Sequence, residues 1–260
     1  MPLGTARYWS WLFAAAEARA PLLGVYALSA EWQALLDPAT ENTVAQLKLA
    51  WWQQEMQRLV AGCAAHPISG YLAALPHAAS VDFRPLLTAV NAIALQVSGV
   101  PLERSADLEP HSQAVWGDPL ALASRLAAPF TDETGLRDCT GALAAADYLS
   151  RAIRGYRREA RVGRVPFAID ELMTAGVDND ALVDDLPAPR LRNYLDSLHD
   201  RAARYFETAA QALPRVERSR HRHLLVLTAL GLKHLKSRAL TLPRRWPNDM
   251  LLAWTTARRA

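Results

Sequence analysis

The stretch of the sequence best suited to chemistry is a run of arginines between positions 151 and 164. On a helix with 100° per residue, Arg151, Arg154 and Arg158 share one broad face. A guanidinium group matches phosphate oxygens with two parallel hydrogen bonds and stays charged at any cellular pH. The spacing therefore predicts a site for a diphosphate, a lipid headgroup or a nucleic-acid backbone, formed by Arg151, Arg154, Arg158 and Arg164. The alternative is a solvated helix face, which is what most charge runs form.

Other chemical signatures are missing or weak. The sequence has no glycine-rich phosphate loop, no Gly-x-Ser-x-Gly, no His-Glu-x-x-His and no Cys-x-x-Cys. His221 and His223 are two residues apart among arginines, so they point to different sides of a helix and their surroundings repel a cation. The densest acidic cluster consists of Asp178, Asp180, Asp184 and Asp185. Two prolines follow it closely, so we expect a capped surface loop, no bound metal and no cofactor.

The elements that position the arginines are expected to be helices. Apolar residues recur at helical spacing along almost the whole chain, as at Leu47, Trp51 and Met56, and alternating β-branched runs are absent. Expected helices cover residues 6–19, 21–37, 40–61, 67–76, 82–98, 107–127, 132–161, 168–175, 179–185, 188–213, 216–240 and 247–258. The sequence therefore predicts an all-α protein.

Prolines and capping residues mark the expected breaks between helices. Pro21 can open one helix, Asp37-Pro38 can close it, and Thr40 with Glu41 can cap the next. No linker rich in Gly and Ser and no repeat with a period of 20–50 residues divides the chain. We therefore expect a single domain over residues 1–260, with a basic helical tail from about residue 215.

The eight tryptophans fall within apolar helical stripes and are expected in the core. Trp51 and Trp52 are adjacent and point 100° apart, so at least one should be buried.

Composition limits the class of protein. The chain has 260 residues, of which 51% are apolar and 21% charged, as in globular proteins. The net charge of +3 is uneven, because residues 215–260 hold eleven Arg or Lys against two acids. Two cysteines cannot build a disulfide framework, the N-terminus lacks a secretory signal, and the longest uncharged stretches contain Pro, His and Gly. We expect a cytoplasmic protein, with a peripheral membrane location as the alternative.

Several segments, in order, resemble the squalene/phytoene synthase family. The resemblance covers about residues 7–213 and rests on residues 7–9, 22–31, 47–52, 111–117, 163–167, 170–172 and 176–177. It implies an isoprenoid-synthase-like bundle around a deep apolar cavity, with two aspartate-rich motifs facing each other across the mouth. Residues 21–37 and 132–161 would be the two facing helices.

The two motifs that hold magnesium in this family are eroded here. The first, normally Asp-Asp-x-x-Asp, is replaced by residues 33–37, of which only Asp37 is acidic. In the second, an Asn and two Asp become Arg151, Gly155 and Glu159. At an effective dielectric constant of ~20, a unit positive charge about 6 Å from Mg²⁺ costs roughly 5 kcal/mol. A site with three magnesium ions is therefore not expected.

The erosion favours a family member that lacks head-to-head condensation activity and acts as an isoprenoid- or lipid-anion-binding or assembly module. The pattern also resembles a divergent branch similar to the mitochondrial complex I assembly factor of this family. In this interpretation Arg151 and Arg158, two turns apart, reach a single diphosphate without metal.

The alternative is an active prenyltransferase or terpene-forming enzyme, with Asp37 and Glu159 holding Mg²⁺. Expected partners are an isoprenoid diphosphate or lipid, and a membrane surface or a protein in an assembly. Nucleic acid is disfavoured because no nucleic-acid motif accompanies the basic segments.

Overall fold

The computed structural model describes residues 2–37, 39–128, 132–184, 187–237 and 246–260, and within them the regular elements are helices and no strand occurs. This confirms the all-α prediction. The α-helices are α1 (Ala6–Leu12), α2 (Ala16–Ala34), α3 (Asn42–Val60), α4 (Pro67–Ala73), α5 (Arg84–Val97), α6 (Leu108–Ser112), α7 (Asp118–Ala127), α8 (Glu133–Ala160), α9 (Ile169–Ala175), α10 (Pro189–Ala212), α11 (Arg222–Lys236) and α12 (Trp246–Arg259). Short 3-10 helices are η1 (Ala78–Ser80), η2 (Ser105–Asp107), η4 (Asp180–Leu182) and η5 (Arg215–Glu217), and the π-helical turn η3 (Gln113–Gly117) joins α6 to α7.

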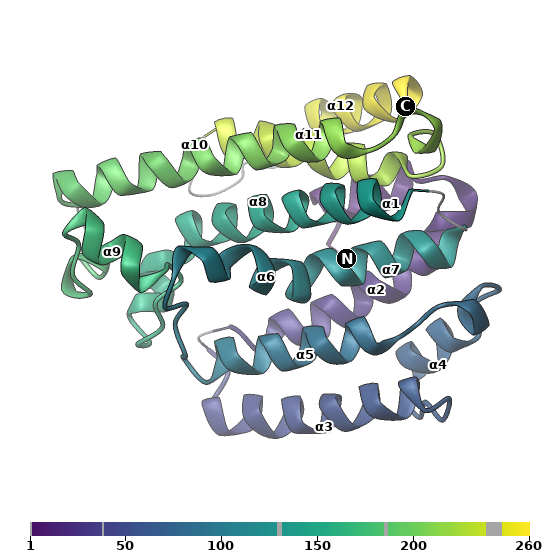
Figure 1. The fold of residues 1–260 in the computed structure, drawn as a ribbon, viewed down its shortest axis with the longest axis horizontal. Coiled ribbons are helices and arrows are strands. Elements are labelled where there is room, and N and C mark those ends of the chain that lie inside the picture. Colours follow the sequence, from purple (N-terminus) through teal and green to yellow (C-terminus); the bar gives the residue numbers. More distant parts are fainter. Residues whose placement is uncertain (1, 38, 129–131, 185–186, 238–245) are drawn as a thin grey trace.

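Most of the helices run side by side along the long axis of the molecule (Figure 1). α8 packs along α10, α2 along α7, and α3 along α5, while α1 and α12 both pack on α11. The ends of α2 and α8 lie on the two sides of one cavity, as expected for residues 21–37 and 132–161. None of the helices in the described ranges combines the length and the hydropathy needed to cross a bilayer.

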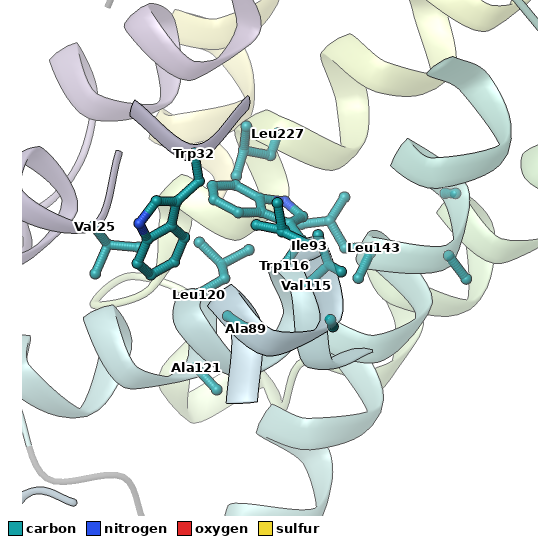
Figure 2. Packing of buried hydrophobic residues seen from close by; sticks show 14 of the residues in the cluster. Val25, Trp32, Ala89, Ile93, Val115, Trp116, Leu120, Ala121, Leu143 and Leu227 are labelled. Atoms are coloured by element: carbon teal, nitrogen blue, oxygen red, sulfur yellow. The ribbon is translucent and has the colours of Figure 1, made fainter. Parts of the chain in front are cut away.

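The space between the central helices is filled by large apolar side chains. Trp32 is 1% exposed and Trp116 is 3% exposed, and both pack among residues of α2, α5 and α7 (Figure 2). Trp52 is also buried, whereas the adjacent Trp51 is 42% exposed, which confirms the expectation for this pair. The expectation that all tryptophans lie in the core is wrong for Trp254 as well as Trp51, because both are exposed.

The break between the first two helices differs from the prediction. α1 ends at Leu12 and α2 begins at Ala16, so Pro21 lies inside α2 and does not open it. Arg222 stabilises this break by donating hydrogen bonds to the carbonyl oxygens of Phe13 and Ala14, at 2.8 and 3.3 Å. A contact across more than two hundred residues leaves no local signal in the sequence.

The predicted cap of α3 is also wrong. The residue at the N-cap is Glu41, whose side chain makes no capping hydrogen bond. Thr40 instead donates from its hydroxyl to the carbonyl oxygen of Ala34, at 3.1 Å. Thr40 therefore satisfies a carbonyl at the C-terminus of the preceding helix, where the last turn leaves such groups unpaired.

Two expected helices are shorter in the structure. Residues 179–185 were expected to form a helix, but the described part contains only the single turn η4, and residue 185 lies outside the described residues. The Asp178 side chain accepts the backbone N–H of Ala181 at 2.8 Å, as expected for a capped loop. The expected helix over 216–240 is divided into η5 and α11, and its last residues lie outside the described ranges.

Candidate anion-binding site

A cavity of about 590 Å³ opens between the C-terminal ends of α2, α5 and α8. Leu36, Val100 and Leu102 give part of its wall an apolar surface, and charged side chains form another part. All six residues that the sequence singled out line this cavity: Asp37, Arg151, Arg154, Arg158, Glu159 and Arg164. The cavity therefore joins an apolar wall to a lining in which four arginines outnumber two carboxylates.

Arg151 is held on the wall of the cavity by its own helix. Its Nε lies 3.0 Å from Asp147 Oδ2, one helical turn earlier. Burial together with the Arg151 charge lowers the pKa of His111. Burial raises the pKa of the neighbouring Tyr148 to about 12, and the Tyr148 hydroxyl donates to the carbonyl oxygen of Pro166 at 3.2 Å. His111 and Tyr148 are therefore neutral at physiological pH and Arg151 remains the charged group.

Arg154 is half-buried one turn further along α8. It forms no hydrogen bond or ion pair with any other residue that the structure describes. Burial lowers the pKa of Arg154, and Asp147 opposes that shift while Arg151 adds to it. Its guanidinium group thus lines the cavity, and none of its N–H groups donates a hydrogen bond to a described residue.

Glu159 is engaged by arginine on both of its oxygens. Arg164 Nε lies 2.9 Å from Glu159 Oε2, and Arg158 Nη2 lies 3.8 Å from Oε1. Arg164 also donates to the carbonyl oxygen of Leu36 at 2.8 Å, and so connects the turn after α8 to the end of α2. The Arg158 side chain is 68% exposed, which places it at the rim while Arg151 and Arg154 lie deeper.

The second remaining carboxylate, Asp37, accepts the backbone N–H of Ala39 at 3.0 Å and so supports the turn after α2. Within the described ranges, no three His, Cys, Asp or Glu side chains group closely enough to hold a metal ion. Mg²⁺ prefers carboxylate and phosphate oxygens in a near-octahedral shell. Since Glu159 is paired with arginine and the lining is predominantly cationic, the residues present do not fit the magnesium that the resemblance implies.

Arg7 is a basic residue near the site that the sequence analysis did not single out as a site residue. Its guanidinium carbon lies 4.1 Å from the ring centre of Trp116 and 5.9 Å from that of Tyr26. Burial lowers the pKa of Arg7, while the nearby Asp147 raises it and Arg151 lowers it further. Arg7, Arg151 and Arg154 therefore surround one carboxylate. Asp147 could have been found from its spacing of four residues to Arg151, but no local signal indicates Arg7.

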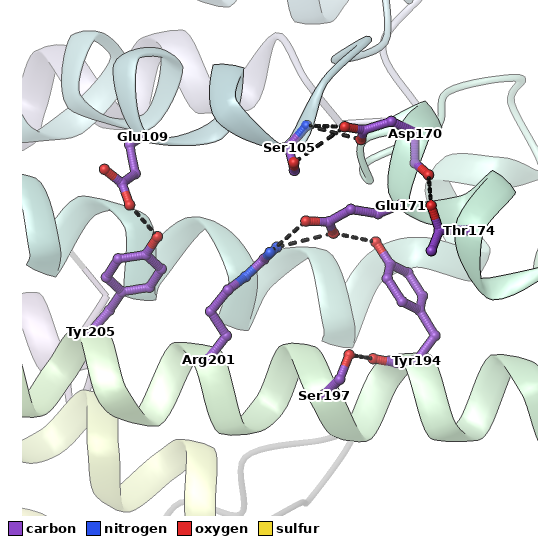
Figure 3. Close-up of polar contacts among 9 residues, drawn as sticks. All are labelled: Ser105, Glu109, Asp170, Glu171, Thr174, Tyr194, Ser197, Arg201 and Tyr205. Carbon is purple, nitrogen blue, oxygen red and sulfur yellow. Dashed lines mark hydrogen bonds and ion pairs between the residues drawn. The ribbon is translucent and has the colours of Figure 1, made fainter.

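A polar network joins α9 to η2 and to α10 beside the cavity (Figure 3). Asp170 accepts the backbone N–H of Ser105 at 2.8 and 2.9 Å. Glu171 accepts the Tyr194 hydroxyl at 2.9 Å and is paired with Arg201, which joins α9 to α10. These acids hold the backbone on either side of the cavity and do not belong to its lining.

The end of α2 with Asp37 and the end of α8 with Glu159 face one cavity in an all-α bundle. A model of the squalene/phytoene synthase family matches residues 4–240. The chain belongs to the squalene/phytoene synthase family. No curated protein sequence matches it.

The fold of this squalene/phytoene synthase family member is similar to solved structures of two synthases. One is a dehydrosqualene synthase in complex with a ligand, with a TM-score of 0.76 and 14% identity over 98% of this chain and 91% of that chain. The other is the squalene synthase HpnC from Alicyclobacillus acidocaldarius, with a TM-score of 0.71 and 19% identity over 88% of this chain and 86% of that chain. At these identities the likeness establishes the fold.

Proposed function

We propose that this family member binds the anionic headgroup of an isoprenoid diphosphate or lipid through arginine, without divalent metal, and acts as a binding or assembly module that lacks head-to-head condensation activity. The observation that carries the proposal is the pair Arg151 and Arg154. Both line the cavity, and Arg154 forms no hydrogen bond or ion pair with a described residue. Asp147 balances only part of their combined charge.

The chemistry of the lining favours an amphiphilic anion. A charge-assisted hydrogen bond from a guanidinium group is worth about 1.5–3 kcal/mol, and a forked pair to phosphate adds specificity. The apolar residues Leu36, Val100 and Leu102 adjoin these arginines in the same cavity. Its volume of about 590 Å³ falls within the range of ligand pockets. A hydrocarbon chain can contact the apolar wall while its phosphate groups meet the arginines.

The proposed lack of condensation activity follows from what replaces the metal ligands. When a diphosphate leaves, the negative charge that develops on it must be stabilised. In active members of the family, magnesium ions are expected to supply that stabilisation. Here Arg151 and Gly155 stand in the second motif, and Glu159 is paired with Arg164. Arginines bind the diphosphate of the intact substrate, but they do not replace several bridging cations.

Product analysis tests the proposed lack of activity. Purified protein with Mg²⁺ and either farnesyl or geranylgeranyl diphosphate is expected to form neither squalene nor phytoene. The alternative, an active prenyltransferase or terpene-forming enzyme, is favoured by one observation, since Asp37 and Glu159 line the same cavity. Hydrocarbon formation near the usual enzyme turnover of ~10 s⁻¹ that is lost in Glu159→Gln would establish that alternative and reject the proposal.

A further inference from the structure

The last helix, α12, lies beyond the family match, which ends at residue 240. One side of this helix is covered by the protein. Ala253 is fully buried in a small cluster with Trp9, Val226 and Leu230. Asp249 is 5% exposed and accepts hydrogen bonds from Lys233 at 2.7 Å and His234 at 2.9 Å. These contacts fix which side of α12 faces outward.

The outward side of α12 is apolar. Met250 is 47% exposed, Leu251 is 56% exposed and Trp254 is 42% exposed. At 100° per residue these three side chains span an arc of about 100°, and the buried Ala253 and Asp249 lie outside that arc. Exposed apolar residues grouped in this way mark interaction surfaces more often than isolated ones do.

The charges next to this apolar surface are positive. The Arg258 guanidinium lies 4.8 Å from the ring centre of Trp254, and Arg259 follows it in the last turn. The acid of α12, Asp249, is buried and paired. Among the described side chains of α12, the exposed charges are therefore those of Arg258 and Arg259 alone.

We propose that the outward face of α12, formed by Met250, Leu251, Trp254 and Arg258, with Arg259 beside it in the last turn, docks the protein on anionic lipid surfaces. Indole rings and leucine side chains enter the boundary between headgroups and acyl chains, while arginines reach lipid phosphates. Each basic side chain near an anionic surface adds attraction that salt screens.

A second copy of the chain fits this face less well than a membrane does. Two copies meeting through α12 bring their Arg258 and Arg259 side chains near each other without an exposed acid on the helix to offset them. Stable interfaces also bury about 800 Å² per partner, and three partly exposed apolar side chains offer much less. The membrane proposal is independent of the proposed function, because the cavity lies at the ends of α2, α5 and α8.

Vesicle co-sedimentation of the full chain tests the proposal. We expect binding to vesicles of equal parts phosphatidylcholine and phosphatidylglycerol, little binding to pure phosphatidylcholine, and weaker binding at high salt. The double variant Leu251→Ser/Trp254→Ser should bind the anionic vesicles at least tenfold more weakly, because it removes most of the apolar surface. The variant Arg258→Gln/Arg259→Gln keeps that surface and should also bind more weakly.

The chain supplies a matched control on α3. Leu47 is 69% exposed and Trp51 is 42% exposed, so Leu47→Ser/Trp51→Ser removes a similar pair from another surface and should leave vesicle binding unchanged. Thermal melting establishes that the variants are folded. The proposal is overturned if the unmodified chain binds neither vesicle or if the α3 and α12 variants bind equally well. It is also overturned if light scattering shows a dimer that the α12 variant alone abolishes.

Discussion

Arg154 is the residue whose environment says most about the cavity. A half-buried guanidinium group loses part of its hydration, and a protein ordinarily compensates such a charge with a carboxylate or with hydrogen bonds. No described residue forms an ion pair or a hydrogen bond with Arg154, because the nearby Asp147 carboxylate is paired with Arg151. Burial lowers the pKa of Arg154, and the Asp147 charge opposes that shift. An anionic ligand in the cavity would supply the missing partner.

Replacing Arg154 with alanine is expected to weaken binding of a non-hydrolysable farnesyl diphosphate analogue by about 1.5–3 kcal/mol, or more than tenfold. Arg158→Ala should cost less, about 1 kcal/mol or below, because solvent screens a side chain that is 68% exposed. Isothermal titration measures both effects. Arg137→Ala serves as the control, since Arg137 is exposed on the same helix outside the cavity. An equal loss for Arg137→Ala would contradict a specific role for Arg154.

At the scale of elements, the turn after α8 fixes the position of the end of α8 relative to the end of α2. Gly163 has a φ of 77°, a left-handed conformation that glycine adopts without steric cost, and it lets the chain reverse directly after α8. Arg164 then spans from Glu159 to the carbonyl oxygen of Leu36. The end of α2 is thereby tied to the end of α8.

Arg164→Ala is expected to lower the free energy of unfolding by about 1–3 kcal/mol. The change removes a hydrogen bond to the Leu36 carbonyl and leaves the Glu159 carboxylate without its nearest partner. Urea denaturation measures the loss. Glu159→Gln should cost less, since Arg164 keeps its bond to Leu36 and an amide oxygen still accepts from a guanidinium. If Arg164→Ala matches the unmodified protein in stability, the turn does not depend on this bridge.

Most helix positions could be predicted from the local spacing of apolar residues. The helix ends that were predicted wrongly depend on contacts with residues outside the helix. Apolar spacing places α3, α8 and α10 within a few residues of their observed bounds, because those helices bury one continuous stripe. The break at residues 13–15 was missed because Arg222 stabilises it from the far end of the chain. Thr40 was misassigned because a threonine between two helices can satisfy either one.

At the scale of the whole molecule, buried histidines make stability depend on pH. Burial lowers the pKa of His223 to about 3 and that of His221 to about 4. In the unfolded chain a histidine takes up a proton near pH 6.5. Between pH 6.5 and these lower values, only the unfolded state binds the proton, so stability falls as the pH falls.

Lowering the pH from 7 to 5 should therefore cost the protein about 2 kcal/mol through His223, with His221 acting in the same direction. His223→Met, which cannot be protonated, should lose less stability over the same interval. Chemical denaturation at the two pH values measures the difference. The same acid-induced loss in both proteins would show that His223 is protonated in the folded state as well.

The cavity was predictable in part. Helical periodicity puts Arg151, Arg154 and Arg158 on one face, and the resemblance indicated which helix lies opposite. The engagement of Glu159 by Arg164 was not predictable, because it depends on the path of a turn. The placement of Arg7 over Trp116 joins residues more than a hundred positions apart, and only the folded chain brings them together.

The central claim, that arginine and not metal holds the anion, is tested most directly by isothermal titration of the farnesyl diphosphate analogue in Mg²⁺ and again in EDTA. The account predicts that the affinity measured in Mg²⁺ and the affinity measured in EDTA agree within about twofold. A tenfold difference would correspond to about 1.4 kcal/mol of binding free energy. Binding that requires Mg²⁺ and is lost in Glu159→Gln but kept in Arg154→Ala would contradict it. That result would show that Asp37 and Glu159 still organise a metal.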